Sequence, residues 1–211
     1  MKELAPGLFH WRVIWPDIWS LECYFLQTDE GSVIIDPIEP GIGPINEATD
    51  VKAVIISIGW HERSARLFAK RTGAPLFVPE RDVCMIEDLD DFDTYGDGDV
   101  LPGEIRAVGA PGLTRGEQVL YSETNGGTIF AGDCLGTTAK WAPGDMILGG
   151  HPNGHPQPRA TLSHLRDLDF QNLCPGHGDA LIGDGKERLI ELFESGESTS
   201  KEPPKVSYFP L

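Results

Sequence analysis

The stretch VIISIGWHERSA, residues 54–65, joins a buried strand to a polar turn. Residues 54–57 form a short apolar run ending in Ser57, which is typical of a strand covered on both faces. The turn after it carries four large or polar side chains, Trp60, His61, Glu62 and Arg63. Strand ends are where α/β proteins place their chemistry. The sequence therefore predicts an α/β fold with a candidate site at this turn.

The length and composition predict a single domain, residues 1–211. A chain of 211 residues with 40% hydrophobic content can bury one core without a linker. Residues 196–211 show no regular apolar pattern, and we expect them to form a surface tail. No segment resembles a signal peptide or approaches the roughly 20 apolar residues of a membrane span. We expect a cytoplasmic protein that does not enter a membrane.

The formal charge of −16 argues against binding to nucleic acid, because a phosphate backbone would be repelled. A small molecule or a protein is the expected partner, and a homo-oligomer is compatible with the sequence. The four cysteines are far apart and form no Cys-x-x-Cys pair, so neither a disulfide framework nor a zinc knuckle is indicated. We expect all four as reduced thiols in the core: Cys23, Cys84, Cys134 and Cys174.

Strands and helices are expected in two blocks. The first third reads as strands joined by tight turns, followed by a helix over Glu62–Thr72 that Gly73 ends and a second helical stretch from Glu80. The second block contains a hairpin at residues 124–127, TNGG, and later two helical patterns. Each block of strands has helices after it. This order suggests two sheets packed on each other with helices outside.

Four segments carry a family resemblance. SIGWHERSA (57–65), APGLTRGE (110–117), IFAGD (129–133) and PGHGD (175–179) occur in an order that resembles the metallo-β-lactamase superfamily over about residues 4–192. The flanking strands match as well. The resemblance implies a four-layer αββα sandwich, in which two mixed β-sheets lie between outer helices.

The same resemblance assigns seven positions that hold two metal ions in the family. Here they are Ile58, Trp60, Glu62, Arg63, Leu113, Asp133 and His177. The three histidines that would hold one ion are replaced by apolar residues, Ile58, Trp60 and Leu113. The positions for the second ion are polar or charged, but only Asp133 and His177 are the family's own residues.

This substitution pattern predicts that the ordinary zinc hydrolase chemistry is lost. A hydrolase of this kind needs metal to generate hydroxide near neutral pH, and apolar side chains donate no lone pair. Arg63 would also repel a cation. We therefore predict a pseudoenzyme without a metal cofactor, which binds a small molecule or a protein in the former active-site cleft.

Two alternatives remain open. The first is a hydrolase that uses one zinc, iron or manganese ion on Glu62, Asp133 and His177, or metal-free acid–base chemistry. Three protein ligands are the number found in catalytic zinc sites. The second is a structural or dimer-forming protein without a ligand.

Two geometric predictions follow from the resemblance. Ile58, Trp60 and Leu113 should contact one another and fill the space of the lost ion. Arg63 should form an ion pair with Asp133 or Glu62 and replace the charge of the second ion, because two carboxylates without a cation would repel each other.

The remaining histidines are expected to have supporting roles. His61 lies between ligand positions, so we expect it at the surface or behind the ligands. His151 and His155, each followed by proline, are expected on a stiff loop without metal that covers the pocket. We expect His10 and His164 to be ordinary structural residues.

Overall fold

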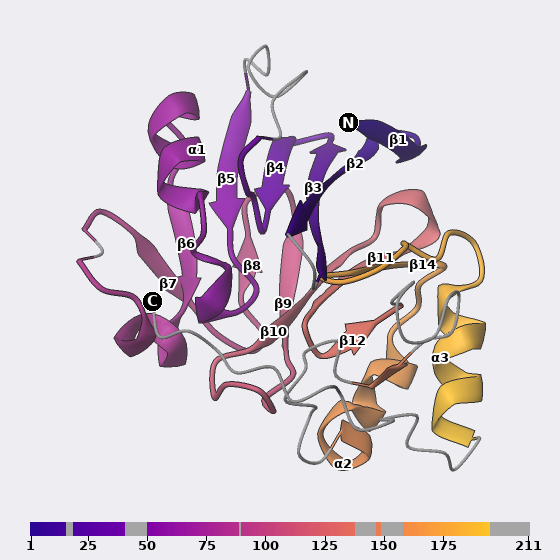
Figure 1. Ribbon diagram of the computed structural model, residues 1–211. Helices are drawn as coiled ribbons and strands as arrows, with labels where there is room; N and C mark the ends of the chain where they lie inside the picture. The colour runs from indigo at the N-terminus through magenta and orange to yellow at the C-terminus, as the bar shows by residue number, and fades with distance from the viewer. Residues whose placement is uncertain (16–18, 41–49, 89, 138–146, 149–157, 195–211) are drawn as a thin grey trace.

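A computed structural model describes residues 1–15, 19–40, 50–88, 90–137, 147–148 and 158–194 (Figure 1). Within these ranges the strands form a seven-stranded sheet, a five-stranded sheet and a small two-stranded sheet. No helix in the described part of the chain is both long enough and apolar enough to cross a membrane. The predicted tail, 196–211, lies outside the described residues.

The seven-stranded sheet follows chain order. Its strands are β1 (Lys2–Ala5), β2 (Leu8–Trp15), β3 (Trp19–Thr28), β4 (Gly31–Ile35), β5 (Val51–Ile55), β6 (Leu76–Pro79) and β7 (Asp93–Tyr95). The strands from β1 to β4 pair antiparallel, and those from β4 to β7 pair parallel. This sheet is therefore mixed, and its parallel half contains the strand that leads into the polar turn.

The five-stranded sheet has the order β14-β11-β10-β9-β8. Its strands are β8 (Val100–Leu101), β9 (Ile105–Gly109), β10 (Gln118–Ser122), β11 (Thr128–Gly132) and β14 (Asn172–Pro175). The predicted hairpin between β10 and β11 is confirmed, with Asn125, Gly126 and Gly127 all at positive φ. Because β11 pairs parallel with β14, this sheet is mixed too. The small sheet pairs β12 (Leu135–Gly136) with β13 (Ile147–Leu148).

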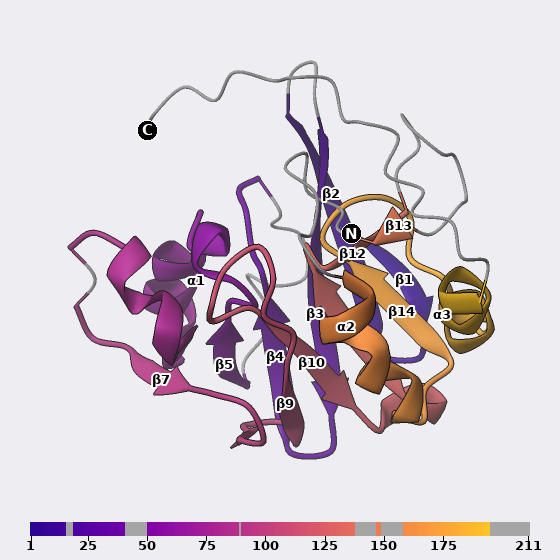
Figure 2. The same ribbon diagram turned by 90° about the horizontal axis from the view of Figure 1, so that it is seen from below.

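Helices cover the outer faces of both sheets, as the fold prediction requires. Figure 2 shows α1 (Ala65–Thr72) at one side of the molecule and α2 (Pro158–Leu162) and α3 (Gly185–Glu194) at the other, with the sheets between them. Phe68 of α1 packs on Val54 of the first sheet, while Leu189 of α3 belongs to the cluster that contains Ile129 of the second. The four layers are thus helix, sheet, sheet and helix.

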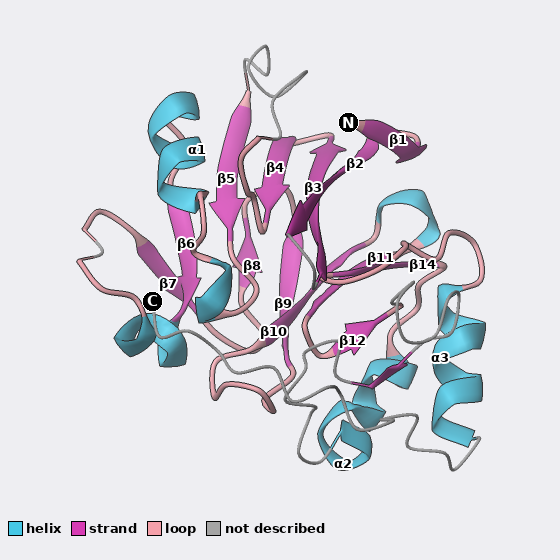
Figure 3. Ribbon diagram, in the orientation of Figure 1, coloured by secondary structure: helices cyan, strands magenta, loops and turns pink. Residues whose placement is uncertain are grey.

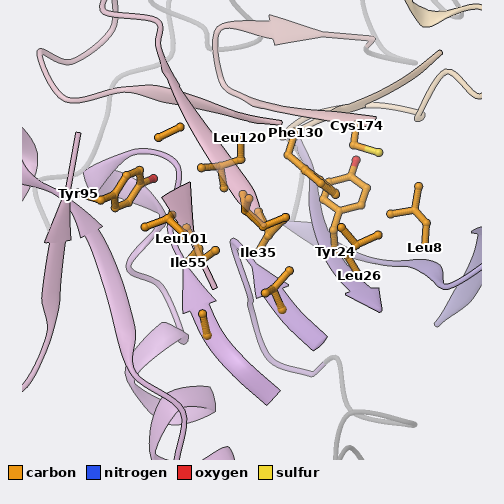
Figure 4. Close-up of a cluster of buried hydrophobic side chains, with 14 residues drawn as sticks. Leu8, Tyr24, Leu26, Ile35, Ile55, Tyr95, Leu101, Leu120, Phe130 and Cys174 are labelled. Atoms are coloured by element: carbon orange, nitrogen blue, oxygen red, sulfur yellow. The ribbon is translucent and has the colours of Figure 1, made fainter. Parts of the chain in front are cut away.

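A third cluster fills the space between the sheets (Figure 4). Along β4, Val33 and Ile35 face this inner cluster while Ile34 faces the helix side. Successive side chains of a strand point to opposite faces, so a strand buried on both sides must be apolar at every position. The continuous apolar runs of β4 and β5 have this cause.

Two helix boundaries differ from the prediction. The helix expected from Glu62 begins at Ala65 and ends at Gly73, whose φ is 70°. Arg63 has a left-handed backbone with φ of 35°, which separates a 3₁₀ turn, Gly59–His61, from the α-helix. The stretch expected from Glu80 is a 3₁₀ segment, Glu80–Met85. Figure 3 shows how little of the chain is helical compared with its strands.

Candidate functional site

Four polar side chains follow directly after strands of the two sheets. Asp36 follows β4 and Asp133 follows β11, while His61 lies in the turn after β5 and His177 in the turn after β14. In the first sheet β4 and β5 run parallel, and in the second sheet β11 and β14 run parallel. The carboxyl ends of the two strands in each sheet therefore meet at one edge of that sheet. The sandwich then brings the two edges together.

The 3₁₀ turn that carries His61 is held by a buried carboxylate. Asp82 accepts hydrogen bonds from Gly59 N at 2.9 Å, from Thr114 Oγ1 at 2.7 Å and from Gly116 N at 2.8 Å. A side chain at position 59 would approach the Cβ atom of Asp82 to 3.0 Å, so the close contact favours glycine there. Asp82 therefore fixes the turn of the first motif to the loop of the second.

The central feature of the site is a carboxylate between two imidazoles. His61 Nε2 and His177 Nε2 each lie 3.1 Å from Asp133 Oδ1. The three side chains are 1%, 4% and 2% exposed for His61, His177 and Asp133. Yet neither His61 Nε2 nor Asp133 Oδ1 has a hydrogen-bond partner of good geometry among the described residues.

The outer nitrogens of both rings are fixed by other groups. His177 Nδ1 lies 2.8 Å from the carbonyl oxygen of Ser20, which can only accept, so Nδ1 carries a hydrogen. His61 Nδ1 lies 3.0 Å from Asp36 Oδ2, and Asp36 also accepts from the amide and hydroxyl of Ser57. A neutral ring with its hydrogen on Nδ1 turns a lone pair toward Asp133 Oδ1. A proton or a metal ion must therefore lie between each Nε2 atom and the carboxylate.

One metal ion fits this donor set. Two imidazole nitrogens and a carboxylate oxygen are common ligands of zinc and similar ions, and the three donor atoms lie within 4.8 Å of one another. Bonds of about 2.0–2.1 Å in tetrahedral geometry would place ligand atoms about 3.3 Å apart, close to the two observed distances. Histidine ligands also usually donate their second nitrogen to a carboxylate or carbonyl, as both rings do here. A buried group of His61, Asp133 and His177 could thus hold one metal ion.

The charges of the site are strongly coupled. Burial alone would raise the pKa of Asp133, but the facing rings of His61 and His177 hold it well below its usual value. Burial and the nearby Arg63 charge oppose protonation of His61, yet Asp133 and Asp36 outweigh them and raise its pKa. Without an ion, the two carboxylates therefore favour protonation of His61.

A second buried carboxyl group lies beside this cluster. Glu117 is fully buried, and one oxygen accepts from Leu113 N at 3.2 Å while the other, Oε1, has no partner in the described part of the chain. Burial raises its pKa well above the usual value, and the charge of Asp133 adds to that effect. Burial therefore favours the protonated form of Glu117.

The three apolar replacements do not form one buried cluster. Ile58 is fully buried, Leu113 is half-buried and Trp60 is 40% exposed. With Trp60 40% exposed, a fully buried cluster of the three side chains is excluded, while contact among them stays a prediction. Two of the three positions, 58 and 60, belong to a short turn, and a 3₁₀ turn points successive side chains about 120° apart.

The predicted ion pair of Arg63 is also absent from the described residues. Glu62 pairs with Arg66 at 2.7 Å, and Asp133 faces the two histidines. Arg63 nevertheless contributes to the site. Burial alone would raise the pKa of Asp36, and the positive charge of Arg63 opposes this effect and lowers it. The guanidinium thus acts on the carboxylate behind His61. Glu62, an alternative ligand in the sequence prediction, is replaced in the ligand group by His61.

His61 and Asp36 are the functional residues that the motif comparison missed. His61 was expected at the surface or behind the ligands, yet it is buried at the centre of the site. In a 3₁₀ turn residues three apart lie above each other, and His61 N donates to Ile58 O at 2.9 Å. Position 61 is thereby brought to the side of position 58, the first family ligand position. The spacing alone does not indicate this direction, because the dihedral angles of the turn decide which side chain faces inward.

The other histidines have separate locations. His10 pairs with the buried carboxylate of Glu22, which also accepts from Arg12 Nε at 2.7 Å. His164 lies in the 3₁₀ segment Ser163–Asp167 that follows α2. His151 and His155 lie outside the described residues. Cys134, next to Asp133, is buried, and burial raises the pKa of its thiol well above the usual value.

Comparisons with known proteins support the fold. No protein-family model and no curated protein matches the chain. A metallo-beta-lactamase from Pontibacter korlensis superposes with a TM-score of 0.66 at 14% identity, over 92% of this chain and 97% of that one. A metallo-beta-lactamase family protein from Thermus thermophilus gives 0.63 at 18% identity, over 92% and 80%. A class B3 di-zinc metallo-beta-lactamase from an Alaskan soil metagenome gives 0.55 at 17% identity, over 92% and 88%.

At these identities the similarity establishes architecture. The chain has a metallo-β-lactamase-like α/β fold with two mixed sheets and few helices, and it is structurally similar to proteins of that family over most of its length.

Proposed function

We propose that the protein binds one divalent transition-metal ion through His61, Asp133 and His177 and acts as a single-metal hydrolase of this fold. One observation carries the proposal. Both rings have their outer nitrogens fixed by acceptors, and both inner nitrogens face the same oxygen of Asp133. An ion at that point satisfies all three donors with one group.

The residues around the proposed ion have different roles. When bound, an ion of this kind lowers the pKa of a coordinated water and polarises a carbonyl oxygen. Asp36 and the Ser20 carbonyl orient the two rings, and Asp82 holds the turn that delivers His61. Burial raises the pKa of Glu117 while the two rings lower that of Asp133, so Asp133 is the carboxylate that would hold the ion. A second ion does not fit, because Ile58 and Leu113 offer no lone pair and Glu62 is engaged by Arg66.

Metal analysis of protein purified without chelator tests the proposal. We expect close to one equivalent of zinc, iron or manganese, lost in each of the variants His61→Ala, Asp133→Ala and His177→Ala. Glu62→Ala is the matched control and should keep its metal. Metal that persists in His61→Ala but is lost from Glu62→Ala would restore the ligand set with Glu62. Ester or thioester hydrolysis that requires the ion is then measured on the same samples.

A pseudoenzyme is the second candidate. It is favoured by the residues at the family ligand positions, of which five are altered, and by the positive charge of Arg63 close to His61. In that case the protein is metal-free and His61 remains an imidazolium between Asp36 and Asp133. Absence of metal from all samples, with a folded wild type, would favour this function. A small-molecule partner and a cytoplasmic location stay predictions in either case.

A further inference from the structure

Arg63 carries a buried donor that nothing in the described residues uses. Its Nη1 atom is buried and has no hydrogen-bond partner there, and no carboxylate of the described chain pairs with its guanidinium. The residue as a whole is only partly buried, and its charge acts on Asp36 and His61 of the site. A charged donor in this state is costly unless a group outside the described residues satisfies it.

The neighbouring carboxylates are already engaged. Asp36 accepts from Ser57 and faces His61, and Glu62 is held by Arg66 at 2.7 Å. Asp133 lies between the two rings, and Glu117 is fully buried and accepts from Leu113 N. None of these groups is available to satisfy Arg63 without breaking a contact that the site uses.

Charge balance points in the same direction, and this step rests on the proposed function. Asp36 and Asp133 together balance a divalent ion, which leaves Arg63 as surplus positive charge next to it. In a chain with a net charge of −16, a positive centre at the site is a local exception. It would attract a small anion.

We propose that Arg63 binds an oxyanion group, a carboxylate or a phosphate, of the small-molecule ligand of this site. The planar guanidinium presents several donors in a fork that matches two oxygens of such a group. The ligand would place its oxyanion on Arg63 and its reacting group toward His61, Asp133 and His177. Position 63, a metal-ligand position in the family resemblance, thereby becomes the position that selects the ligand class.

Binding of inorganic phosphate and of acetate to metal-loaded and metal-free protein tests the proposal. We compare wild type with Arg63→Met, which keeps the aliphatic stem, and Arg63→Lys, which keeps the charge but not the fork. Arg66→Met is the control, because Arg66 pairs with Glu62 and with carbonyls of residues 87 and 88. The relative affinities of phosphate and acetate distinguish a phosphorylated ligand from a carboxylate ligand.

We expect the Arg63→Met variant to bind at least about tenfold more weakly, as for loss of a charge-assisted pair. Arg63→Lys should be intermediate, and the control unchanged. Chemical shifts of the Arg63 side-chain N–H groups in wild type provide a readout that does not depend on a variant folding. Equal affinity in wild type and Arg63→Met, or no binding of either anion to wild type, would overturn the inference.

The outcome is separable from that of the metal proposal. Metal content should be the same in wild type and Arg63→Met. If the protein binds metal but wild type and Arg63→Met have the same anion affinity, the ligand inference is contradicted and the metal proposal is not. If the protein binds no metal but Arg63→Met still weakens anion binding to the metal-free protein, the single-metal hydrolase proposal is contradicted and the ligand inference is not.

Discussion

The two groups of predicted ligand positions present different kinds of side chain. The first group, positions 58, 60 and 113, carries apolar side chains that differ in burial. Ile58 is fully buried, whereas Trp60 is 40% exposed. In the second group, buried polar side chains from both sheets meet within hydrogen-bonding range, and His61 joins Asp133 and His177. The comparison teaches that the strand ends of the two sheets can bring a donor set together at a position that the motif alignment does not select.

The largest effect is expected from breaking the polar group. In Asp133→Ala the two rings lose the anion that lies between them, and uncompensated buried charge is strongly destabilising. We expect a loss of about 3–5 kcal/mol in the free energy of unfolding, measured by urea denaturation. Asp133→Asn, which keeps the shape but not the charge, separates electrostatics from packing. A loss below about 1 kcal/mol in Asp133→Ala would mean that the cluster is not tightly coupled.

The apolar group should respond only in stability. Ile58 is fully buried, and Ile58→Ala should cost about 2–4 kcal/mol through lost burial and the cavity left behind. Its metal content should equal that of wild type, because position 58 offers no lone pair. Loss of metal from a variant that remains folded at the assay temperature would show that the two groups are not independent, since Ile58 precedes the turn that carries His61.

Trp60→Ala should have a smaller effect than Ile58→Ala. A fully buried ring would cost about 3–5 kcal/mol on truncation, but this ring is 40% exposed. We expect about 1–2 kcal/mol, in proportion to the smaller buried area, by thermal or chemical denaturation. A loss as large as that of a core tryptophan would favour the prediction that Trp60 fills the vacated space.

Much of the fold was predictable from the sequence, for identifiable reasons. The apolar runs of β4 and β5, the TNGG hairpin and Gly73 at the end of α1 are local signals with a direct physical cause. The order of four motif segments then gave the sandwich. Asp133 follows β11 immediately and His177 lies in the turn after β14, so both are at the strand ends that the motifs indicate.

The details of the first turn were not predictable in the same way. Counting ligand positions assumes that the backbone of the turn is shared with the family. Here the backbone follows a 3₁₀ turn and then a left-handed Arg63, and this path decides which side chain faces inward. In the sequence, Asp36 is part of a pattern that indicates a turn. Only the packing of β4 beside β5 makes it the partner of His61. Side-chain direction after a strand depends on dihedral angles that a motif does not specify.

The smallest effect is expected at Glu117, where the direction depends on pH. The carboxyl group has a folded pKa well above its ordinary value of 4.5. A raised carboxyl pKa means that the folded state holds its proton while the unfolded state releases it. That contribution to stability is fully present below the ordinary pKa and is lost as pH rises toward the folded pKa. Glu117→Gln cannot ionise, so it avoids this loss while keeping an acceptor for Leu113 N.

The variant should therefore become more stable relative to wild type as pH rises from 4 to about 8, because only the wild type loses stability at this position. The amide adds buried N–H donors where an unpartnered oxygen stood, which offsets part of the gain. Urea denaturation of both proteins across that range measures the difference, and the remaining titrating groups cancel between them. Parallel curves would mean that Glu117 ionises in the folded protein as it does in the unfolded chain, and would place a third anion beside Asp133.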